Sequence, residues 1–252
     1  MNIDSVINSL FLPRKTIFKQ DENDHLIETS DGIKIGIRLF MKNKNFINIL
    51  YFHGNAELAV EYSDIASFYN NIGANLIVSD YRGYGLSNGN PNKYNLLSDA
   101  NCIFKYVNNY LTKNNYLGKK IIMGRSLGCA SALEIVSNYQ KYIDACIIES
   151  GFIDELPIFK LFNIDIKQYN YNISDGFENL KKIKKLIKPL LIIHAELDHI
   201  IPYNQTKLMI NHASSKKKYL CKIKGANHNN LIMIDKNLYF QSIQNLIQNL
   251  DD

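Results

Sequence analysis

Short apolar runs alternate along this chain with longer segments in which apolar residues recur at the three- and four-residue spacing of a helix. The short runs are rich in isoleucine, leucine and valine, as is typical of strands buried on both faces. We therefore predict an α/β fold, in which a mostly parallel central sheet carries helices on both faces. The predicted central strands are 47–52, 74–79, 120–123, 145–149, 189–193 and 219–223, and the predicted helices are 57–71, 96–111, 127–138, 203–212 and 231–250.

Two segments depart from this alternation. Residues 26–40 read as two strands around a turn at 30–32, which predicts an N-terminal antiparallel hairpin. Residues 151–187 lie between two predicted strands without a strand pattern of their own, and this length allows a few short helices that form a lid. Because no internal repeat or linker interrupts the chain, we expect one domain over residues 1–252 with a small lid insertion at 151–187.

The pentapeptide Gly124-Arg125-Ser126-Leu127-Gly128 has the form G-x-S-x-G and lies between a predicted strand and a predicted helix. In that context the motif makes a nucleophile elbow, a sharp turn that lifts the serine oxygen clear of the backbone. Larger side chains two residues either way would collide with their surroundings, which explains the two glycines. We therefore predict Ser126 as a nucleophile rather than as an ordinary turn serine.

A serine hydroxyl needs a base and a group that orients the base, and candidates for both follow later in the chain. Asp198 and His228 each lie on a loop just after a predicted strand. The order Ser, Asp, His is that of enzymes with a nucleophile elbow, and all these residues follow strands that end at one edge of the sheet. The alternatives are a helix cap for Asp198, a surface position for His228, and Glu149 as the acid.

Two backbone N–H groups must point at the oxyanion that forms when a serine attacks a carbonyl. One is expected from Leu127, the residue after the nucleophile, and the other from the loop that follows the strand at 47–52. In that loop Gly54 lets the backbone approach closely, and we predict the Asn55 N–H as the second donor. For His53 we favour a structural role as a buried turn residue.

The lid segment is apolar at its start, and the predicted substrate-binding residues are Phe152, Ile153 and, close to the acid, Ile200. Apolar side chains line most small-molecule pockets, so the lid could form the wall of an acyl-chain site. The same side chains could equally cover the sheet without touching a ligand. A short lid leaves the serine open, so we expect short to medium acyl chains to be accepted with a graded preference.

Together these motifs resemble those of the α/β-hydrolase-fold serine hydrolases. The resemblance is to the branch with an HGNA oxyanion loop, here 53–56, and a DYRGYGxSxG loop, here 80–89. That branch includes Bem-type proteins, protein-depalmitoylase-like hydrolases and bacterial esterase-like proteins, and the match runs over about residues 31–249. The resemblance implies the same nucleophile, acid, base and oxyanion donors as those predicted above. The chain departs from the branch at Ala195, where a glycine is usual, and it lacks the lipidated cysteine cluster of the eukaryotic depalmitoylase-like members.

Composition excludes several other classes. The 252 residues carry a net charge of +5, but the lysine clusters at 181–185 and 216–218 are not interleaved with aromatic residues, so nucleic-acid binding is not predicted. No apolar run approaches the length of a transmembrane helix, and the N-terminus has no signal-peptide pattern. The four cysteines lack metal-type spacing and read as reduced core thiols, so we expect a cytoplasmic protein. The sequence indicates no oligomeric state.

These features predict a hydrolase that cleaves ester or thioester bonds of small-molecule or acylated substrates through an acyl-enzyme on Ser126, without a metal or an organic cofactor. Two alternatives stay open. The first is a serine peptidase or amidase, because related sequences are described as serine aminopeptidase-like, although the lid offers only Asp154 and Glu155 to bind a substrate amine. The second is a non-catalytic member of the fold that binds a partner or a small ligand.

Overall fold

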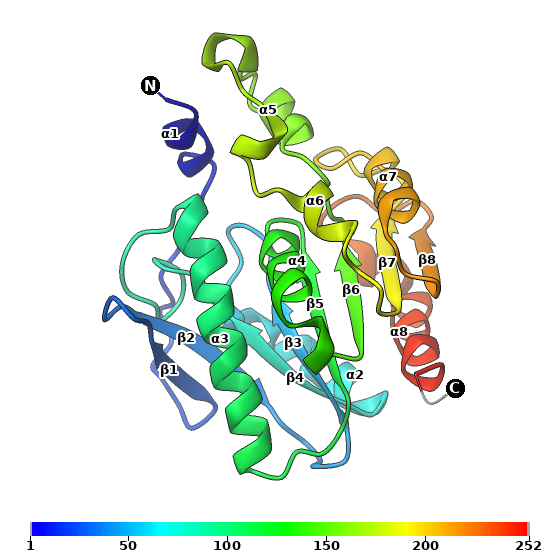
Figure 1. The fold of residues 1–252 in the computed structure, drawn as a ribbon. Helices are drawn as coiled ribbons and strands as arrows, with labels where there is room; N and C mark the ends of the chain where they lie inside the picture. Colours follow the sequence, from blue (N-terminus) through cyan, green and yellow to red (C-terminus); the bar gives the residue numbers. More distant parts are fainter. Residues whose placement is uncertain (1, 251–252) are drawn as a thin grey trace.

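The computed structural model describes residues 2–250 as strands and helices that alternate along most of the chain (Figure 1). The strands are β1 (Asp24–Glu28), β2 (Lys34–Phe40), β3 (Ile47–Phe52), β4 (Ala74–Ser79), β5 (Lys120–Arg125), β6 (Ala145–Glu149), β7 (Leu190–Ala195) and β8 (Lys218–Ile223). The helices are α1 (Ile3–Asn8), α2 (Ser63–Asn71), α3 (Lys93–Lys113), α4 (Gly128–Tyr139), α5 (Leu156–Leu161), α6 (Asn179–Ile183), α7 (Asn204–His212) and α8 (Leu231–Gln248). Short 3-10 helices lie at η1 (Ala59–Tyr62), η2 (Gln140–Tyr142), η3 (Ile166–Tyr169) and η4 (Ile173–Asp175).

The strands form one sheet in the order β1-β2-β4-β3-β5-β6-β7-β8. The hairpin β1–β2 joins the sheet antiparallel to β4, and every pair from β4 to β8 is parallel. Every residue of β3, β4, β6 and β7 is buried, because helices cover both faces of these central strands. Since parallel strands end at the same edge, the loops after β3, β5, β6, β7 and β8 meet there.

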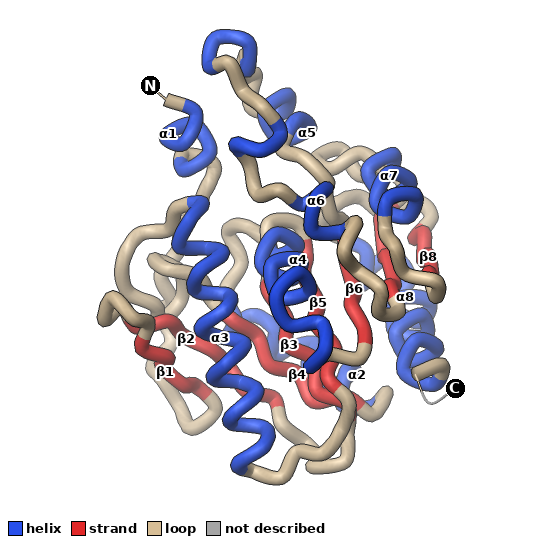
Figure 2. The backbone as a smooth tube through the Cα atoms, viewed as in Figure 1, coloured by secondary structure: helices blue, strands red, loops and turns tan. Residues whose placement is uncertain are grey.

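The sheet separates two layers of helices (Figure 2), and an apolar cluster lies on each of its faces. On one face of the sheet, α3, α4, α7 and the segment after β6 bury an apolar cluster that also takes in α1. On the other face, α2 and α8 bury a second cluster against the same strands. This arrangement confirms the predicted α/β-hydrolase fold, with a mostly parallel sheet covered on both sides.

The observed elements differ from the expected ones mainly at their ends. The segment 57–71, predicted as one helix, forms η1 followed by α2. The Glu61 side chain accepts a hydrogen bond from the Leu58 N–H, and this contact starts the first turn at Leu58. The helix predicted over 231–250 bends at Asp235, whose backbone is not helical. In the part of the chain that is described, no helix is both long enough and apolar enough to span a bilayer.

The lid segment between β6 and β7 consists of α5, η3, η4 and α6, as short as the sequence predicts (Figure 1). Its centre is the buried carboxylate of Glu155, which accepts hydrogen bonds from the Phe177 N–H at 2.7 Å and from the Tyr171 hydroxyl at 2.5 Å. A Cβ at Gly176 would stand 2.0 Å from that carboxylate, so a larger residue there would displace it. One side chain therefore fixes the fold of the lid over the sheet.

Candidate active site

Ser126 lies at the turn between β5 and α4, with a positive φ of 50°. A non-glycine residue rarely adopts such a backbone, and here the Ser126 N–H donates a 2.9 Å hydrogen bond to the Glu149 carbonyl at the end of β6. A Cβ at Gly124 would meet the Gly128 carbonyl at 2.4 Å, and one at Gly128 would meet the Phe52 carbonyl at 2.0 Å. The turn therefore needs both glycines for close packing, and the serine is half-buried at the sheet edge.

His228 and Asp198 are in contact at the same edge. His228 Nδ1 lies 2.8 Å from Asp198 Oδ2, and both residues are buried, with 3% and 8% of their surface exposed. The loop after β7 carries the aspartate and the loop after β8 carries the histidine. Because Nδ1 faces the carboxylate, Nε2 is the ring nitrogen left to act on another group.

Asp198 is held as an anion by its surroundings. Its Oδ1 accepts the backbone N–H groups of Ile200 and Ile201, at 3.0 and 2.8 Å. Burial on its own would raise the pKa of this carboxyl, but the hydrogen bonds from His194, His228 and the Ile201 N–H hold the pKa well below its usual range. A carboxylate that stays ionised can orient a histidine and stabilise its protonated form.

A neighbouring histidine, His194, and the alternative acid, Glu149, have other partners. His194 is fully buried, and it bonds the Ile201 carbonyl and the Thr206 hydroxyl besides approaching Asp198 at 3.3 Å. These contacts hold His194 against the loop that carries Asp198. Glu149, the alternative acid, makes no hydrogen bond or ion pair with His228 among the described residues.

Two residues that line the same cavity as Ser126 and His228 have a backbone N–H without an assigned hydrogen bond in residues 2–250. They are Leu127, just before the first residue of α4, and Asn55, in the loop after β3. The Leu127 N–H is also at a helix N-terminus, where the helix dipole favours negative charge. His53, in contrast, is fully buried, with Nδ1 at 2.7 Å from the Gly54 carbonyl.

The Asn55 side chain has a role that the sequence analysis did not predict. Its Nδ2 donates to the Leu10 carbonyl at 2.7 Å, and its Oδ1 accepts the Leu12 N–H at 2.9 Å. The Tyr84 hydroxyl donates to the same Oδ1 at 2.6 Å. The side chain thus joins the oxyanion-type loop to the N-terminal segment of the chain, some 45 residues away in sequence.

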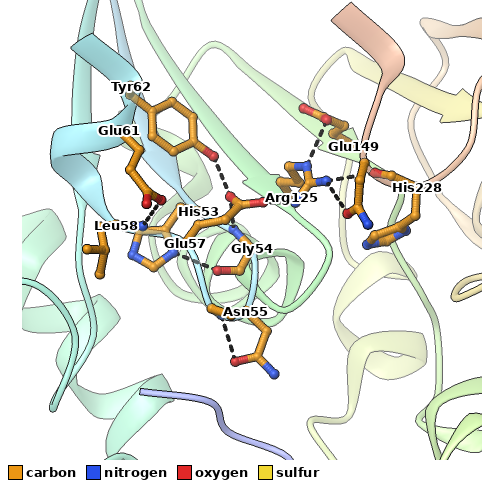
Figure 3. A network of polar contacts seen from close by, with 12 residues as sticks. His53, Gly54, Asn55, Glu57, Leu58, Glu61, Tyr62, Arg125, Glu149 and His228 are labelled. Carbon is orange, nitrogen blue, oxygen red and sulfur yellow. Dashed lines mark hydrogen bonds and ion pairs between the residues drawn. The ribbon is translucent and has the colours of Figure 1, made fainter. Parts of the chain in front are cut away.

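Arg125, the residue before the nucleophile candidate, connects the loops around the site (Figure 3). Its guanidinium pairs with Glu57, and it also pairs with Glu149 at 3.1 Å. Its Nη2 donates to the His228 carbonyl at 2.7 Å. Glu57 in turn accepts the Gly54 N–H at 2.8 Å, so one guanidinium links the oxyanion-type loop, the end of β6 and the histidine loop.

This network also explains the glycine of the oxyanion-type loop. A Cβ at Gly54 would stand 2.5 Å from Arg125 Nη1 and 2.8 Å from Glu57 Oε1. The position is kept small by the ion pair beside it, in addition to the close backbone approach expected from the sequence. The sequence signals that could have indicated the network are an arginine inside the elbow motif and a glutamate that ends β6.

A cavity of about 300 Å³ opens at this edge and is lined at one end by polar residues and over the rest by apolar side chains. The polar end holds Asn55, Arg125, Ser126, His228 and Asn229. The apolar lining consists of Ile7, Leu10, Phe11, Leu12, Ala56, Leu127, Ile158, Leu161, Phe162, Phe177 and Ile200. In the described part of the chain no carboxylate borders this cavity, and no group of three or more His, Cys, Asp and Glu side chains is placed to hold a metal ion.

Of the predicted substrate-binding residues, only Ile200 borders the cavity. Phe152 and Ile153 lie one layer deeper, directly after β6, and are 0% and 5% exposed. The ring of Phe152 packs edge-on against Phe177, with centroids 6.3 Å apart, and Phe177 is the residue that borders the cavity. Phe152 and Ile153 follow the end of β6 directly, before the chain turns over Ser126. They therefore lie beneath the wall of the cavity and support it.

Comparison with known proteins identifies relatives of this chain. Residues 44–169 match the family described as serine aminopeptidase, S33. The chain is 30% identical over 208 residues to protein bem46 of Schizosaccharomyces pombe, covering 81% of this chain and 68% of that protein. It is 29% identical over 205 residues to alpha/beta hydrolase domain-containing protein 17C of Mus musculus, covering 79% of this chain and 58% of that protein.

Among solved structures, an esterase of Pyrococcus furiosus is similar with a TM-score of 0.74 at 16% identity, over 94% of this chain and 96% of that one. This likeness shows the fold. With the relatives above, it establishes that the chain belongs to the α/β-hydrolase-fold serine hydrolases, in the branch that contains the Bem-type and esterase-like proteins.

Proposed function

We propose that this hydrolase cleaves ester or thioester bonds of acyl substrates through an acyl-enzyme on Ser126. The observation that carries the proposal is the buried His228–Asp198 pair, which opens onto a cavity with Ser126 at its polar end and apolar side chains beyond. A cavity of this kind suits a small molecule whose carbonyl lies at the serine and whose acyl chain lies among apolar groups.

The chemistry follows from the positions of the groups. His228 takes the proton of the Ser126 hydroxyl as the oxygen attacks the carbonyl, and Asp198 stabilises the imidazolium that forms. The N–H groups of Leu127 and Asn55 bind the oxyanion. His228 then gives the proton to the leaving alcohol or thiol, and water attacks the acyl-enzyme by the same route and releases the acid.

The cavity lining favours esters and thioesters over peptides with a free N-terminus. A substrate amine would be bound by a carboxylate, and none borders the cavity in residues 2–250. The two lid carboxylates suggested by the sequence are engaged: Asp154 accepts the Leu156 N–H at 3.0 Å, and Glu155 anchors the lid. Cytoplasmic location remains a prediction.

The proposal is tested by Ser126→Ala, with Ser131→Ala as a matched control on α4. Ser131 has a fully buried hydroxyl without a hydrogen-bond partner among the described residues, so its loss should cost little. We expect Ser126→Ala to lower the hydrolysis of 4-nitrophenyl butyrate and of butyryl thioesters by several orders of magnitude, about 10³-fold or more, without lowering the unfolding midpoint.

A fluorophosphonate probe gives an independent readout. It should label the wild-type protein and Ser131→Ala but not Ser126→Ala. Equal labelling of all three proteins would mean that the probe reacts at another residue, and it would refute Ser126 as the nucleophile. No labelling together with no ester turnover would favour a non-catalytic binding protein. Faster turnover of aminoacyl-amides than of esters would instead favour a peptidase.

A further inference from the structure

The apolar end of the cavity has two walls that come from distant parts of the chain. One is the lid, through Ile158, Leu161 and Phe162. The other is the N-terminal segment Ile7–Leu12, which includes the end of α1 and borders the cavity through most of its residues. In Figure 1, α1 and α5 both lie beyond the carboxyl ends of the central strands. The N-terminal segment precedes residues 44–169, so the family match assigns it no role.

The N-terminal wall is fixed to the site by specific contacts. The side-chain amide of Asn55 binds the Leu10 carbonyl through its nitrogen and the Leu12 N–H through its oxygen. The ring of Phe11 packs edge-on against Phe177, with centroids 6.5 Å apart, and both rings line the cavity. An apolar segment held by polar backbone contacts is positioned to shape a pocket rather than merely to cover the sheet.

Lys93, at the start of α3, ties the two walls together. Its ammonium pairs with Asp4 of α1 at 2.7 Å and donates to the Asp175 carbonyl of the lid at 2.5 Å. Its backbone N–H donates to Asn8 Oδ1 at 2.9 Å. The Lys93 side chain is only 7% exposed, so a buried side chain holds the two walls together.

We propose that the acyl chain of the substrate lies between the segment Ile7–Leu12 and the lid, and that the N-terminal wall limits its length. This inference rests on the proposed ester hydrolysis, and it adds the segment of the protein that limits the length of an apolar acyl group. Asn55 is a specificity-determining residue through its side chain, because the same residue supplies an oxyanion N–H and holds the wall. Leu10 is the wall side chain best suited to a test, since it is only half-buried and its substitution disturbs little core packing.

The experiment compares Leu10→Trp with Ser9→Trp. Both place the same bulk on neighbouring residues, but Ser9 is exposed and does not border the cavity. In the wild type, kcat/KM for 4-nitrophenyl esters should rise about four-fold per methylene from acetate until the cavity is filled. Leu10→Trp should lower the octanoate-to-acetate ratio of kcat/KM by at least about ten-fold, and Ser9→Trp should keep the wild-type ratio. Leu10→Ala should raise the ratio.

A binding measurement separates this inference from the proposed function. Displacement of a fluorescent fatty acid by decanoate is followed on Ser126→Ala protein, alone and combined with Leu10→Trp or Ser9→Trp. If the added Leu10→Trp weakens decanoate binding and the added Ser9→Trp does not, the acyl site is supported. This result would hold even if no ester were hydrolysed, in which case only the proposed function would be refuted. Ser126-dependent hydrolysis with the same chain-length ratio in Leu10→Trp and wild type would overturn the N-terminal wall and leave the proposed function standing.

Discussion

Arg125 should affect both stability and catalysis, because it connects the parts of the site that carry the chemistry. Its side chain is 11% exposed, against 25% for Glu57 and 4% for Glu149. Removing one partner of a buried ion pair costs about 3–5 kcal/mol, since the remaining charge loses its compensation. We therefore expect Arg125→Met to lower the free energy of unfolding by about 3–5 kcal/mol, a large part of the 5–15 kcal/mol typical of a domain.

The catalytic effect follows from another contact of the Arg125 guanidinium, its 2.7 Å hydrogen bond to the His228 carbonyl. Without that bond, and without the Glu57 contact to the Gly54 N–H, His228, the proposed base, and the loop that carries the proposed oxyanion donor lose a shared support. A displacement of about 1 Å lowers a rate by about 10²-fold. Arg125→Lys keeps the charge but not the planar guanidinium that reaches several partners at once. Its kcat/KM and its stability should therefore lie between those of Arg125→Met and of the wild type.

The matched control is Arg82→Met. Arg82 forms a comparable ion pair with Asp99 at 2.7 Å, with side chains 10% and 6% exposed, and it does not border the cavity. Urea unfolding gives the stability of each variant. The kcat/KM for a butyrate ester is then measured under conditions in which both variants are folded. Both should lose stability, and only Arg125→Met should lose about 10²-fold in kcat/KM. Equal kcat/KM in the two folded variants would refute the positioning role.

The remaining predictions concern two buried carboxylates. Asp198→Asn should lower kcat by about 10⁴-fold, because the amide cannot hold His228 in the required tautomer. Since the pKa of Asp198 is held below its ordinary value of 3.8, its ionised form stabilises the folded protein above that pH; urea unfolding should show the wild type losing more stability than Asp198→Asn as the pH falls below about 4. Burial raises the pKa of Glu155 above 4.5, so its contribution to stability decreases as the pH rises through that value. Unfolding curves at pH 7 should therefore show Glu155→Gln at least as stable as wild type, and Glu155→Ala about 1–3 kcal/mol less stable because the Phe177 N–H is left unpaired.

The sequence predicted well those features that depend on short stretches of chain. The central strands follow from apolar runs, and a parallel sheet brings the residues after these runs to one edge, as seen for Ser126, Asp198 and His228. The two glycines of the elbow were explained by close packing, and the structure shows the backbone atoms that they approach. The catalytic roles of these residues stay predictions until activity is measured.

Contacts between distant segments could not be predicted in the same way. The partners of Arg125 come from two loops and from the end of β6, and no periodic pattern relates residues 57, 149 and 228. Phe152 and Ile153 were placed in the pocket because they open the apolar lid segment, yet their position directly after a strand end buries them beneath it. Apolarity predicts that a residue leaves water, but it does not tell whether a ligand or another side chain covers it.

The N-terminal segment shows the same limit most clearly. A helix of six residues such as α1 is not stable by itself, so its place is determined by what it docks on. Here the docking groups are Lys93 and the Asn55 side chain, both far away in sequence and both polar. Because Asn55 also lies in the oxyanion-type loop, we expect a shift of the N-terminal wall to reach the Asn55 N–H that is proposed to bind the oxyanion. The length of the acyl chain and the rate of its hydrolysis are therefore expected to vary together when this segment is altered, even though the segment contains none of the residues that carry out the reaction.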